Sequence, residues 1–348
     1  MSATQAENPG ETLSGAQIVV RLLEQQGITT VCGIPGGAIL PLYDALSGTN
    51  KIHHVLARHE QGAGFMAQGM ARATGKPAVC LASSGPGATN LLTAIADAKL
   101  DSIPVVAITG QVPKAMIGTD AFQEVDTYGL SIPITKHNFL VSSAEELLEV
   151  IPRAFEIAAS GRPGPVLVDI PKDVQNQRIE VKHWPAPGRA LPAPAAEEAS
   201  IHKAIEMIAA ADKPILYLGG GVVHSGAAEL AVSLAEKASL PTVMTLMALG
   251  AMPVDHPLSL GMLGMHGARC TNLALDECDL LIAIGARFDD RATGKVAAFC
   301  PNAKIIHIDI DPSELDKIKT AHIGIAGDVT EVLRTLLPWV QPTLRKRW

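Results

Sequence analysis

The chain has 348 residues, enough for two domains, and its 47% hydrophobic and 18% charged residues are typical of a globular protein rather than a disordered one. A net charge of −7, a pI near 5.9 and 3% aromatic residues give no reason to expect a nucleic acid or an anionic membrane as partner. Five cysteines without a C-x-x-C pair predict reduced thiols in a cytoplasmic protein, and we expect neither a signal peptide nor a membrane span.

The N-terminal half alternates helical and extended patterns. Residues 1–11 are expected to be disordered and residues 12–183 to form a first domain. Alternation of this kind predicts a parallel sheet with helices on both faces, and its nearly all-apolar strands indicate burial on both sides. The expected helices are 14–26, 39–46, 62–73, 88–98 and 144–159, and the expected strands lie around Val31 and at 52–57, 77–82, 104–109 and 165–170.

A proline-rich stretch divides the chain. Residues 184–200 contain four prolines, which cannot continue a helix or a central strand, so they are expected to form a linker. A second domain is expected over 201–338, followed by a tail at 339–348. The fold class is therefore α/β, with two consecutive three-layer domains and mainly parallel sheets, the second of them Rossmann-like. In the second domain the expected helices are 201–210 and 226–238, and the expected strands are 214–218, 242–244, 279–284 and 304–310.

Glu60 is the first candidate for chemistry. It follows an expected strand and precedes a helix rich in small residues, in which Gly, Ala, Phe65 and Met66 would shield its carboxyl group from water. Thiamine diphosphate needs such a carboxyl, because its aminopyrimidine removes the thiazolium C2 proton only while it shares a proton with an acid. On periodicity alone, an ordinary acid in a charged patch with Arg58 and His59 remains an alternative.

Several motifs occur here in the order found in one enzyme family. The chain resembles the large catalytic subunits of the acetolactate synthase (acetohydroxyacid synthase) family, which depend on thiamine diphosphate, and it is most similar to the bacterial valine-sensitive type. The resemblance runs from about Thr12 to about Leu337, and several motifs in register are a stronger signal than one glycine-rich turn. The motifs are residues 33–41, 58–64, 84–90, 109–113, 122–124, 161–165, 171–173 and 285–291.

The resemblance implies that residues 12–183 hold the pyrimidine side of the cofactor, with Pro86 and Asn90 beside Glu60. Without it, Gly85–Gly87 before a helix would suggest a phosphate site and Lys172 a solvated surface residue. The family joins two keto acids, and the planar guanidinium of Arg291 matches the group that binds the carboxylate of the second one. The catalytic residues implied are Glu60, Phe122, Gln123, Lys172 and Arg291.

A dinucleotide site is expected in the second domain. Gly219–Gly221 follow an expected strand and Asp309 ends a later one, although the spacing to Gly226 departs from G-x-G-x-x-G and a plain turn stays open. In the family, this domain binds extended FAD with a mainly structural role, because joining two keto acids requires no net electron transfer. The positions that match its FAD contacts are Arg162, Gly219, Gly220, Gly221, Thr245, Leu246, Leu263, Gly264, Met265, His266, Gly285, Ala286, Arg287, Asp289, Arg291, Asp309, Ile310, Asp328 and Val329.

The family holds the cofactor's diphosphate and Mg²⁺ with a third domain, whose Gly-Asp-Gly…Asn motif does not occur here. No metal ligand is expected in this chain, since His266 has no partners at ligand spacing. We therefore expect an N-terminal portion of a catalytic subunit, truncated in its tail and inactive alone.

The activity implied is conversion of two pyruvates to 2-acetolactate and CO2, or of pyruvate and 2-oxobutanoate to 2-aceto-2-hydroxybutanoate, as the first step of branched-chain amino acid biosynthesis. A homodimer of catalytic subunits and a small regulatory subunit are implied as well. Two alternatives remain: another thiamine diphosphate-dependent decarboxylase or oxidase of 2-keto acids, and a non-catalytic FAD-binding or regulatory module.

Overall fold

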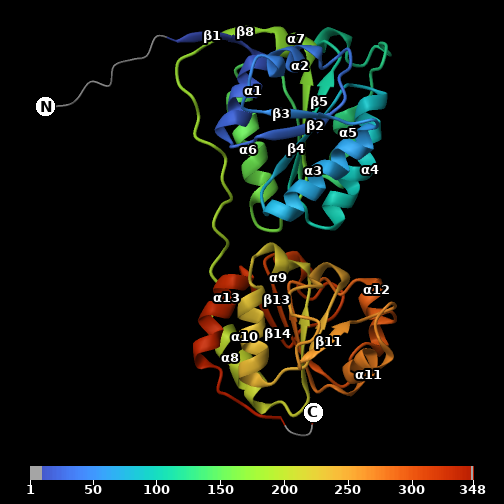
Figure 1. Cartoon of the computed structure of the whole chain (residues 1–348), viewed down its shortest axis with the longest axis vertical. Helices are drawn as coiled ribbons and strands as arrows, with labels where there is room; N and C mark the ends of the chain where they lie inside the picture. The colour runs from blue at the N-terminus through green and yellow to red at the C-terminus, as the bar shows by residue number, and fades with distance from the viewer. Residues whose placement is uncertain (1–9, 346–347) are drawn as a thin grey trace, which may run out of the picture. The chain divides into compact units, whose positions relative to one another are not determined.

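The computed structural model describes residues 10–345 and 348 of the chain. It forms two compact α/β units, Met1–Pro192 and Ala193–Trp348, each with its own sheet (Figure 1). The boundary between them falls inside the proline-rich stretch 184–200. The α/β class with parallel sheets that the sequence predicts is confirmed.

The first unit is built on a six-stranded sheet of order β3-β2-β4-β5-β7-β6, in which every neighbouring pair is parallel. From β2 the chain goes to β3 on one side and then to β4 on the other. This reversal creates a crevice at the carboxyl ends of β2 and β4, where ligands of such sheets bind. The strands are β2 (Thr30–Gly33), β3 (His53–Leu56), β4 (Ala78–Ala82), β5 (Val105–Gln111), β6 (His137–Leu140) and β7 (Val166–Pro171).

Helices cover both faces of this sheet (Figure 1). Alternate residues of β4 point to opposite faces, so Val79 and Leu81 pack with α1 and α6, whereas Ala78 and Cys80 pack with α3 and α4. The capping box of Ser14 and Gln17 starts α1. The helices are α1 (Gly15–Gln25), α2 (Leu40–Ser47), α3 (Glu60–Thr74), α4 (Pro86–Leu100), α5 (Thr127–Ser131), α6 (Leu147–Ala159) and α7 (Lys172–Asn176), with 3-10 turns at Lys114–Met116 and Ile132–Ile134.

The prediction that residues 1–11 are disordered is wrong at its end. Residues 1–9 lie outside the described residues, but Glu11 already pairs with Val181, where β1 (Glu11–Ser14) meets β8 (Arg178–Val181) in an antiparallel ribbon. Leu13 is the only apolar residue of β1, so the sequence shows no strand periodicity there. The pairing depends on a partner more than 160 residues away, which no local pattern reveals.

The second unit also contains a six-stranded parallel sheet, of order β11-β10-β9-β12-β13-β14. Counted in chain order within the unit, this is 3-2-1-4-5-6, the arrangement of the dinucleotide-binding Rossmann fold. Its crevice lies where the order reverses, at the carboxyl ends of β9 and β12. The strands are β9 (Pro214–Leu218), β10 (Thr242–Met244), β11 (Ser259–Met262), β12 (Leu280–Ile284), β13 (Lys304–Asp309) and β14 (Ile323–Ala326).

Helices α8, α10 and α13 pack on one face of this sheet, and α11 and α12 on the other. The predicted linker extends too far, because α8 begins at Glu198 rather than at residue 201. Strands β11 and β14 and helices α11 and α13 have no counterpart among the predicted elements. The helices are α8 (Glu198–Ala210), α9 (Gly220–His224), α10 (Ala228–Ala238), α11 (Arg269–Glu277), α12 (Asp290–Thr293) and α13 (Val329–Leu336), with 3-10 turns at Leu246–Ala248, Val296–Ala298, Pro312–Glu314 and Leu337–Trp339.

The described part of the tail at 339–348 packs against the second unit. The Arg345 guanidinium donates to the carbonyl oxygens of Ile208, Ala211 and Ala238, at the ends of α8 and α10, and Trp348 Nε1 donates to the Pro214 carbonyl (2.8 Å). These bonds join distant parts of the chain, so the sequence pattern does not show them.

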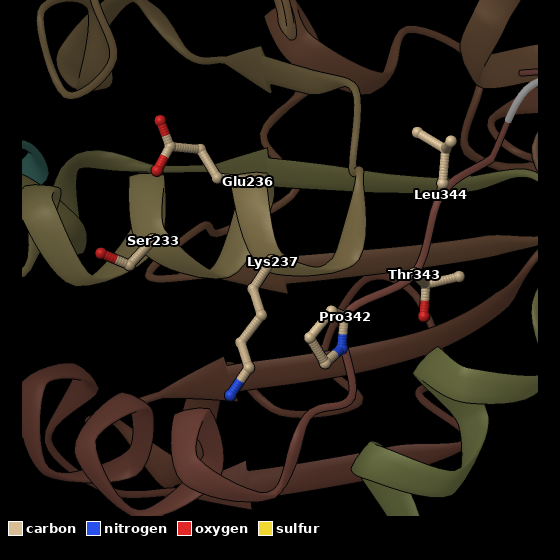
Figure 2. A pocket seen from close by; sticks show the side chains of 6 residues that line it. All are labelled: Ser233, Glu236, Lys237, Pro342, Thr343 and Leu344. Atoms are coloured by element: carbon tan, nitrogen blue, oxygen red, sulfur yellow. The ribbon is translucent and has the colours of Figure 1, made fainter.

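A pocket is lined by α10 and this tail, which are also joined by a hydrogen bond from the Thr343 N–H to the Lys237 carbonyl (3.0 Å). Figure 2 shows the side chains of Glu236 and Lys237 leaving the helix on opposite sides, with Pro342, Thr343 and Leu344 on the facing tail segment. The pocket contains none of the candidate site residues. No helix within 10–345 is long and apolar enough to cross a membrane.

Candidate functional site

The first site centres on Glu60, at the carboxyl edge of the first sheet. Glu60 is the first residue of α3, directly after the His59 cap, and it is half-buried. Asn90, on the neighbouring helix α4, donates from Nδ2 to Glu60 Oε2 over 2.9 Å. The structure thus brings together two of the three residues expected around the aminopyrimidine, and Asn90 fixes the direction of the carboxylate.

A turn with two glycines, Gly85 and Gly87, lies beside this carboxylate. Gly85 has φ +56°, a left-handed conformation that favours glycine, and Gly87 has no side chain where a Cβ would lie 3.5 Å from Glu60 Oε1. Ser83 Oγ accepts the Ala38 N–H (3.2 Å) and so ties this turn to the loop after β2. Pro86, the third expected residue, is exposed at the start of α4. Gly87 therefore places no side chain against Glu60 Oε1, and Gly85 allows the Gln123 backbone to approach the turn closely.

The expectation that Phe65 and Met66 shield Glu60 is wrong. Both are exposed, at 41% and 43%, whereas Ala63 and Ala67 are fully buried. Because α3 already begins at Glu60, the helical period turns residues 63 and 67 toward α4 and the sheet and places residues 65 and 66 on the outer face. Asn90 and the glycine turn are the neighbours that Glu60 has instead.

Gln123 lies against the same turn. A Cβ on Gly85 would come within 2.5 Å of the Gln123 carbonyl oxygen, and Gln123 itself has φ +58°, so the two backbones are in close contact. The Glu124 carboxylate holds this loop by accepting the N–H groups of Gly118 (2.5 Å), Thr119 and Ala121, and the Gly118 bond is the largest cause of its lowered pKa. The Phe122 side chain is 87% exposed.

Two further expected residues stand apart from Glu60. Lys172 begins α7 directly after β7, so it lies at the same carboxyl edge, half-buried. Arg162 precedes β7 and therefore lies at the opposite, amino edge, where its Nε donates to Ser102 Oγ (2.8 Å). The structure does not join Arg162 to the Glu60 site.

The candidate FAD residues of the second unit gather at one edge of its sheet. Every segment follows a parallel strand, and the carboxyl ends of parallel strands share an edge. The candidate residues and the strands that they follow are Gly219–Gly221 after β9, Thr245 and Leu246 after β10, residues 263–266 after β11, Gly285, Ala286 and Arg287 after β12, Asp309 and Ile310 at the end of β13, and Asp328 and Val329 after β14.

The glycines at the crevice pack two turns together. The Gly219 N–H donates to the Ile284 carbonyl (2.9 Å) and the Gly221 N–H to the Gly285 carbonyl (3.1 Å). Two of the three N–H groups of Gly219–Gly221 are therefore already used within the protein and are not free for a phosphate. Close approach of the β9 and β12 turns is what these glycines permit.

Arg291 is joined to the loop after β11. Its carbonyl accepts the Met265 N–H (2.9 Å), while its guanidinium lies 3.7 Å from the Asp290 carboxylate and is well exposed. Asp289 and Asp328 cap α12 and α13, accepting two N–H groups each, so both carboxylates have a structural role in addition to any contact with a cofactor. His266 is exposed, and residues 10–345 contain no group of three potential metal ligands.

Sequence reasoning missed a buried carboxylate in β7. Asp169 is 1% exposed and accepts hydrogen bonds from Thr109 Oγ1 (2.6 Å) and Gln111 Nε2 (3.0 Å). Burial is the largest cause of its raised pKa, about 6. The signal available in the sequence is a single acid within an otherwise apolar strand.

This carboxyl makes the stability of the first unit depend on pH. Because its pKa is higher in the folded than in the unfolded chain, the folded state binds the proton more tightly, and the free energy of unfolding falls as pH rises through about 6. The full effect is about 3 kcal/mol. Asp169→Asn should remove that slope in urea unfolding measured between pH 4 and pH 7. An unchanged slope in the variant would contradict the assignment.

Comparison with known proteins finds a family domain in each of the two units. Residues 13–130 match the thiamine pyrophosphate enzyme N-terminal TPP binding domain, and residues 201–336 match the thiamine pyrophosphate enzyme central domain. The chain is 63% identical over its whole length to the acetolactate synthase isozyme 1 large subunit of Escherichia coli, of which it covers 62%.

Two further relatives extend the same comparison. The chain is 53% identical over 332 residues to the acetolactate synthase large subunit of Corynebacterium glutamicum, covering 53% of that protein. It is 53% identical over 335 residues to the E. coli isozyme 2 large subunit, covering 60%. The chain thus spans little more than half the length of these relatives.

Proposed function

Because the chain belongs to the thiamine pyrophosphate enzymes, whose N-terminal and central domains it carries, we propose that it forms the pyrimidine side of an acetolactate synthase active site. The observation that carries this proposal is the Glu60–Asn90 hydrogen bond beside the glycine turn. The reaction is condensation of two pyruvates to 2-acetolactate with loss of CO2, and 2-oxobutanoate is the alternative acceptor.

The residues around Glu60 fit an aminopyrimidine ring. Gly87 places no side chain against Glu60 Oε1, and Asn90 holds the other carboxylate oxygen, so that Oε1 is available to exchange a proton with the ring. When bound, thiamine diphosphate supplies the C2 carbanion that attacks a 2-keto acid. Glu60 holds or releases the proton on Oε1 as the ring changes its protonation state.

The remaining catalytic candidates of the first unit lie at the same sheet edge as Glu60, whereas Arg291 belongs to the second unit. Gln123 is placed by backbone contact with Gly85, and Phe122 and Lys172 border the same carboxyl edge, where they line the approach of the keto acid. Arg291, exposed in the second unit, binds the carboxylate of the acceptor through its planar fork. We assign no residue of this chain to the diphosphate or to Mg²⁺, and the described residues contain no group of three potential metal ligands.

The second unit is proposed to bind FAD at the crevice between β9 and β12. Its strand order is that of dinucleotide-binding sheets, and the buried Thr245 Oγ1 at this edge has no partner among the described residues. Arg287 and Asp309 stand at the carboxyl ends of the central strands, where the dinucleotide would lie.

Titration of the purified chain with FAD is therefore expected to quench flavin fluorescence. Protein at tens of micromolar is sufficient for a micromolar binder, an order-of-magnitude choice. Arg287→Ala should weaken this binding, whereas Arg153→Ala, on an exposed face of α6 in the first unit, should leave it unchanged. Failure of the unaltered chain to retain FAD on a sizing column would refute the FAD proposal.

Partners follow from the same family. The relatives are named large subunits, so we propose a small regulatory subunit and a homodimer of catalytic subunits. All five cysteines are free and four are buried, a state that the reducing cytoplasm maintains, and we place the protein there.

The activity is tested in a hybrid, in which this chain replaces the matching part of the E. coli isozyme 1 large subunit. The hybrid with thiamine diphosphate, Mg²⁺ and FAD is expected to convert pyruvate to acetolactate. Pyruvate consumption without acetolactate would favour a decarboxylase or oxidase. A folded hybrid that binds the cofactors and consumes no pyruvate would favour a non-catalytic module.

A further inference from the structure

The buried Asp169 belongs to a polar network that reaches the surface loop of Gln123. Gln111, 3% exposed, donates from Nε2 both to Asp169 Oδ2 (3.0 Å) and to the carbonyl oxygen of Val125 (2.9 Å). Its Oε1 accepts the N–H of Val112 (2.9 Å). The amide therefore uses both of its N–H groups and its oxygen, and it links the end of β5, β7 and the loop.

Val125 stands two residues after Gln123, whose backbone lies against Gly85. The rest of the loop is held by hydrogen bonds nearer the surface, in which the Glu124 carboxylate accepts the N–H groups of Gly118 and Ala121. The Val125 carbonyl also accepts the N–H of Thr127 (2.8 Å), a local bond within the same stretch of chain. The Gln111–Val125 bond is the one that ties this carbonyl to the end of β5.

We propose that Asp169 is a positioning residue of this site: through Gln111 and the Val125 carbonyl it fixes the loop that carries Phe122 and Gln123. The catalytic part of this role rests on the proposed acetolactate synthase function, whereas the fixing of the loop does not. A carboxylate can only accept hydrogen bonds, so Asp169 forces the Gln111 NH2 group to face it and the Val125 carbonyl together. The opposite orientation of the amide would place Gln111 Oε1 against two acceptors.

The presence of an ionisable carboxyl at the buried position 169 supports the positioning role of Asp169. Burial raises the pKa of Asp169 to about 6, and the negative charge of Asp126 acts in the same direction, so the protein keeps an acid where its charged form is disfavoured. Among the described residues, Thr109 and Gln111 are the side chains that hydrogen-bond to it. The Thr109 hydroxyl donates to Asp169 and not to the loop, which makes Thr109 a matched control.

The test is hydrogen exchange of the full chain, followed by mass spectrometry at neutral pH. Gln111→Met keeps the volume of the side chain but removes all three bonds, and it is expected to speed exchange of the 118–125 amides about tenfold or more. Thr109→Val removes one bond to Asp169 and should leave that segment as in the unaltered chain. Asp169→Asn, which can still accept from Gln111, should restore the protection that Asp169→Val removes.

In the hybrid enzyme, Gln111→Met should lower kcat at least tenfold with little change in KM, and Thr109→Val should change neither by more than about twofold. Equal loosening of the 118–125 segment in Gln111→Met and Thr109→Val, or none in Gln111→Met, would overturn the positioning role. If the unaltered hybrid makes no acetolactate, the proposed function fails while the exchange result still decides the role of Asp169.

Discussion

Replacement of Glu60 by glutamine in the hybrid enzyme is expected to lower kcat by roughly 10²–10⁴-fold, the usual worth of one acid–base step. Glutamine keeps the size of the side chain and can still accept the Asn90 N–H, but it cannot exchange a proton at Oε1. The affinity for thiamine diphosphate should fall much less, because most of the binding energy is expected from the diphosphate end.

The measurement is steady-state acetolactate formation at saturating pyruvate, together with a cofactor titration. Glu149→Gln, an exposed carboxylate in the first turn of α6, is the matched control and should behave as the unaltered hybrid. Near-normal turnover of Glu60→Gln would show that another group exchanges the proton.

Substitution of Gly219 by alanine is expected to destabilise the second unit by about 3 kcal/mol, as overpacking of a backbone contact does. A Cβ there would lie 2.6 Å from Ala286 Cα and closer still to the Gly285 carbonyl oxygen, and neither atom can move without displacing the β12 turn. FAD binding should be lost with it, because this turn forms one wall of the crevice.

Gly220→Ala is the matched control for this change. A Cβ on Gly220 meets only the Met247 Cβ, at 3.1 Å, and alanine favours the first turn of α9. Urea unfolding followed by hydrogen exchange of the β9 and β12 peptides measures both variants. Equal stability of Gly219→Ala and Gly220→Ala would mean that the two turns are not in contact.

The central sheet strands were among the most predictable parts of the fold. Residues 105–108 and 166–168 are continuous apolar runs, because both faces of the sheet are covered by helices, and their burial confirms that pattern. The ribbon of Glu11–Ser14 with Arg178–Val181 could not be predicted, because its stability comes from pairing between distant segments rather than from a local period.

For the candidate site, too, the sequence predicted residues but not the contacts between them. Glu60 and Asn90 were chosen by resemblance, and their direct hydrogen bond is a tertiary fact that spacing alone does not give. The prediction for Phe65 was wrong because it treated Glu60 as a strand-end residue facing the helix, whereas Glu60 is the first residue of α3 and Phe65 lies on the exposed face of the same helix. Gln111 was part of a recognised motif, yet its bond to Val125 depends on how a loop folds back over the sheet.

The central claim is that the Glu60 carboxylate drives loss of the C2 proton of thiamine diphosphate, and the exchange of that proton for deuterium in the hybrid enzyme tests it most directly. In the unaltered hybrid, exchange should be at least as fast as turnover. In Glu60→Gln it should fall by roughly the same 10²–10⁴-fold as kcat. Exchange at the unaltered rate in Glu60→Gln would contradict the claim, whatever the rate of acetolactate formation.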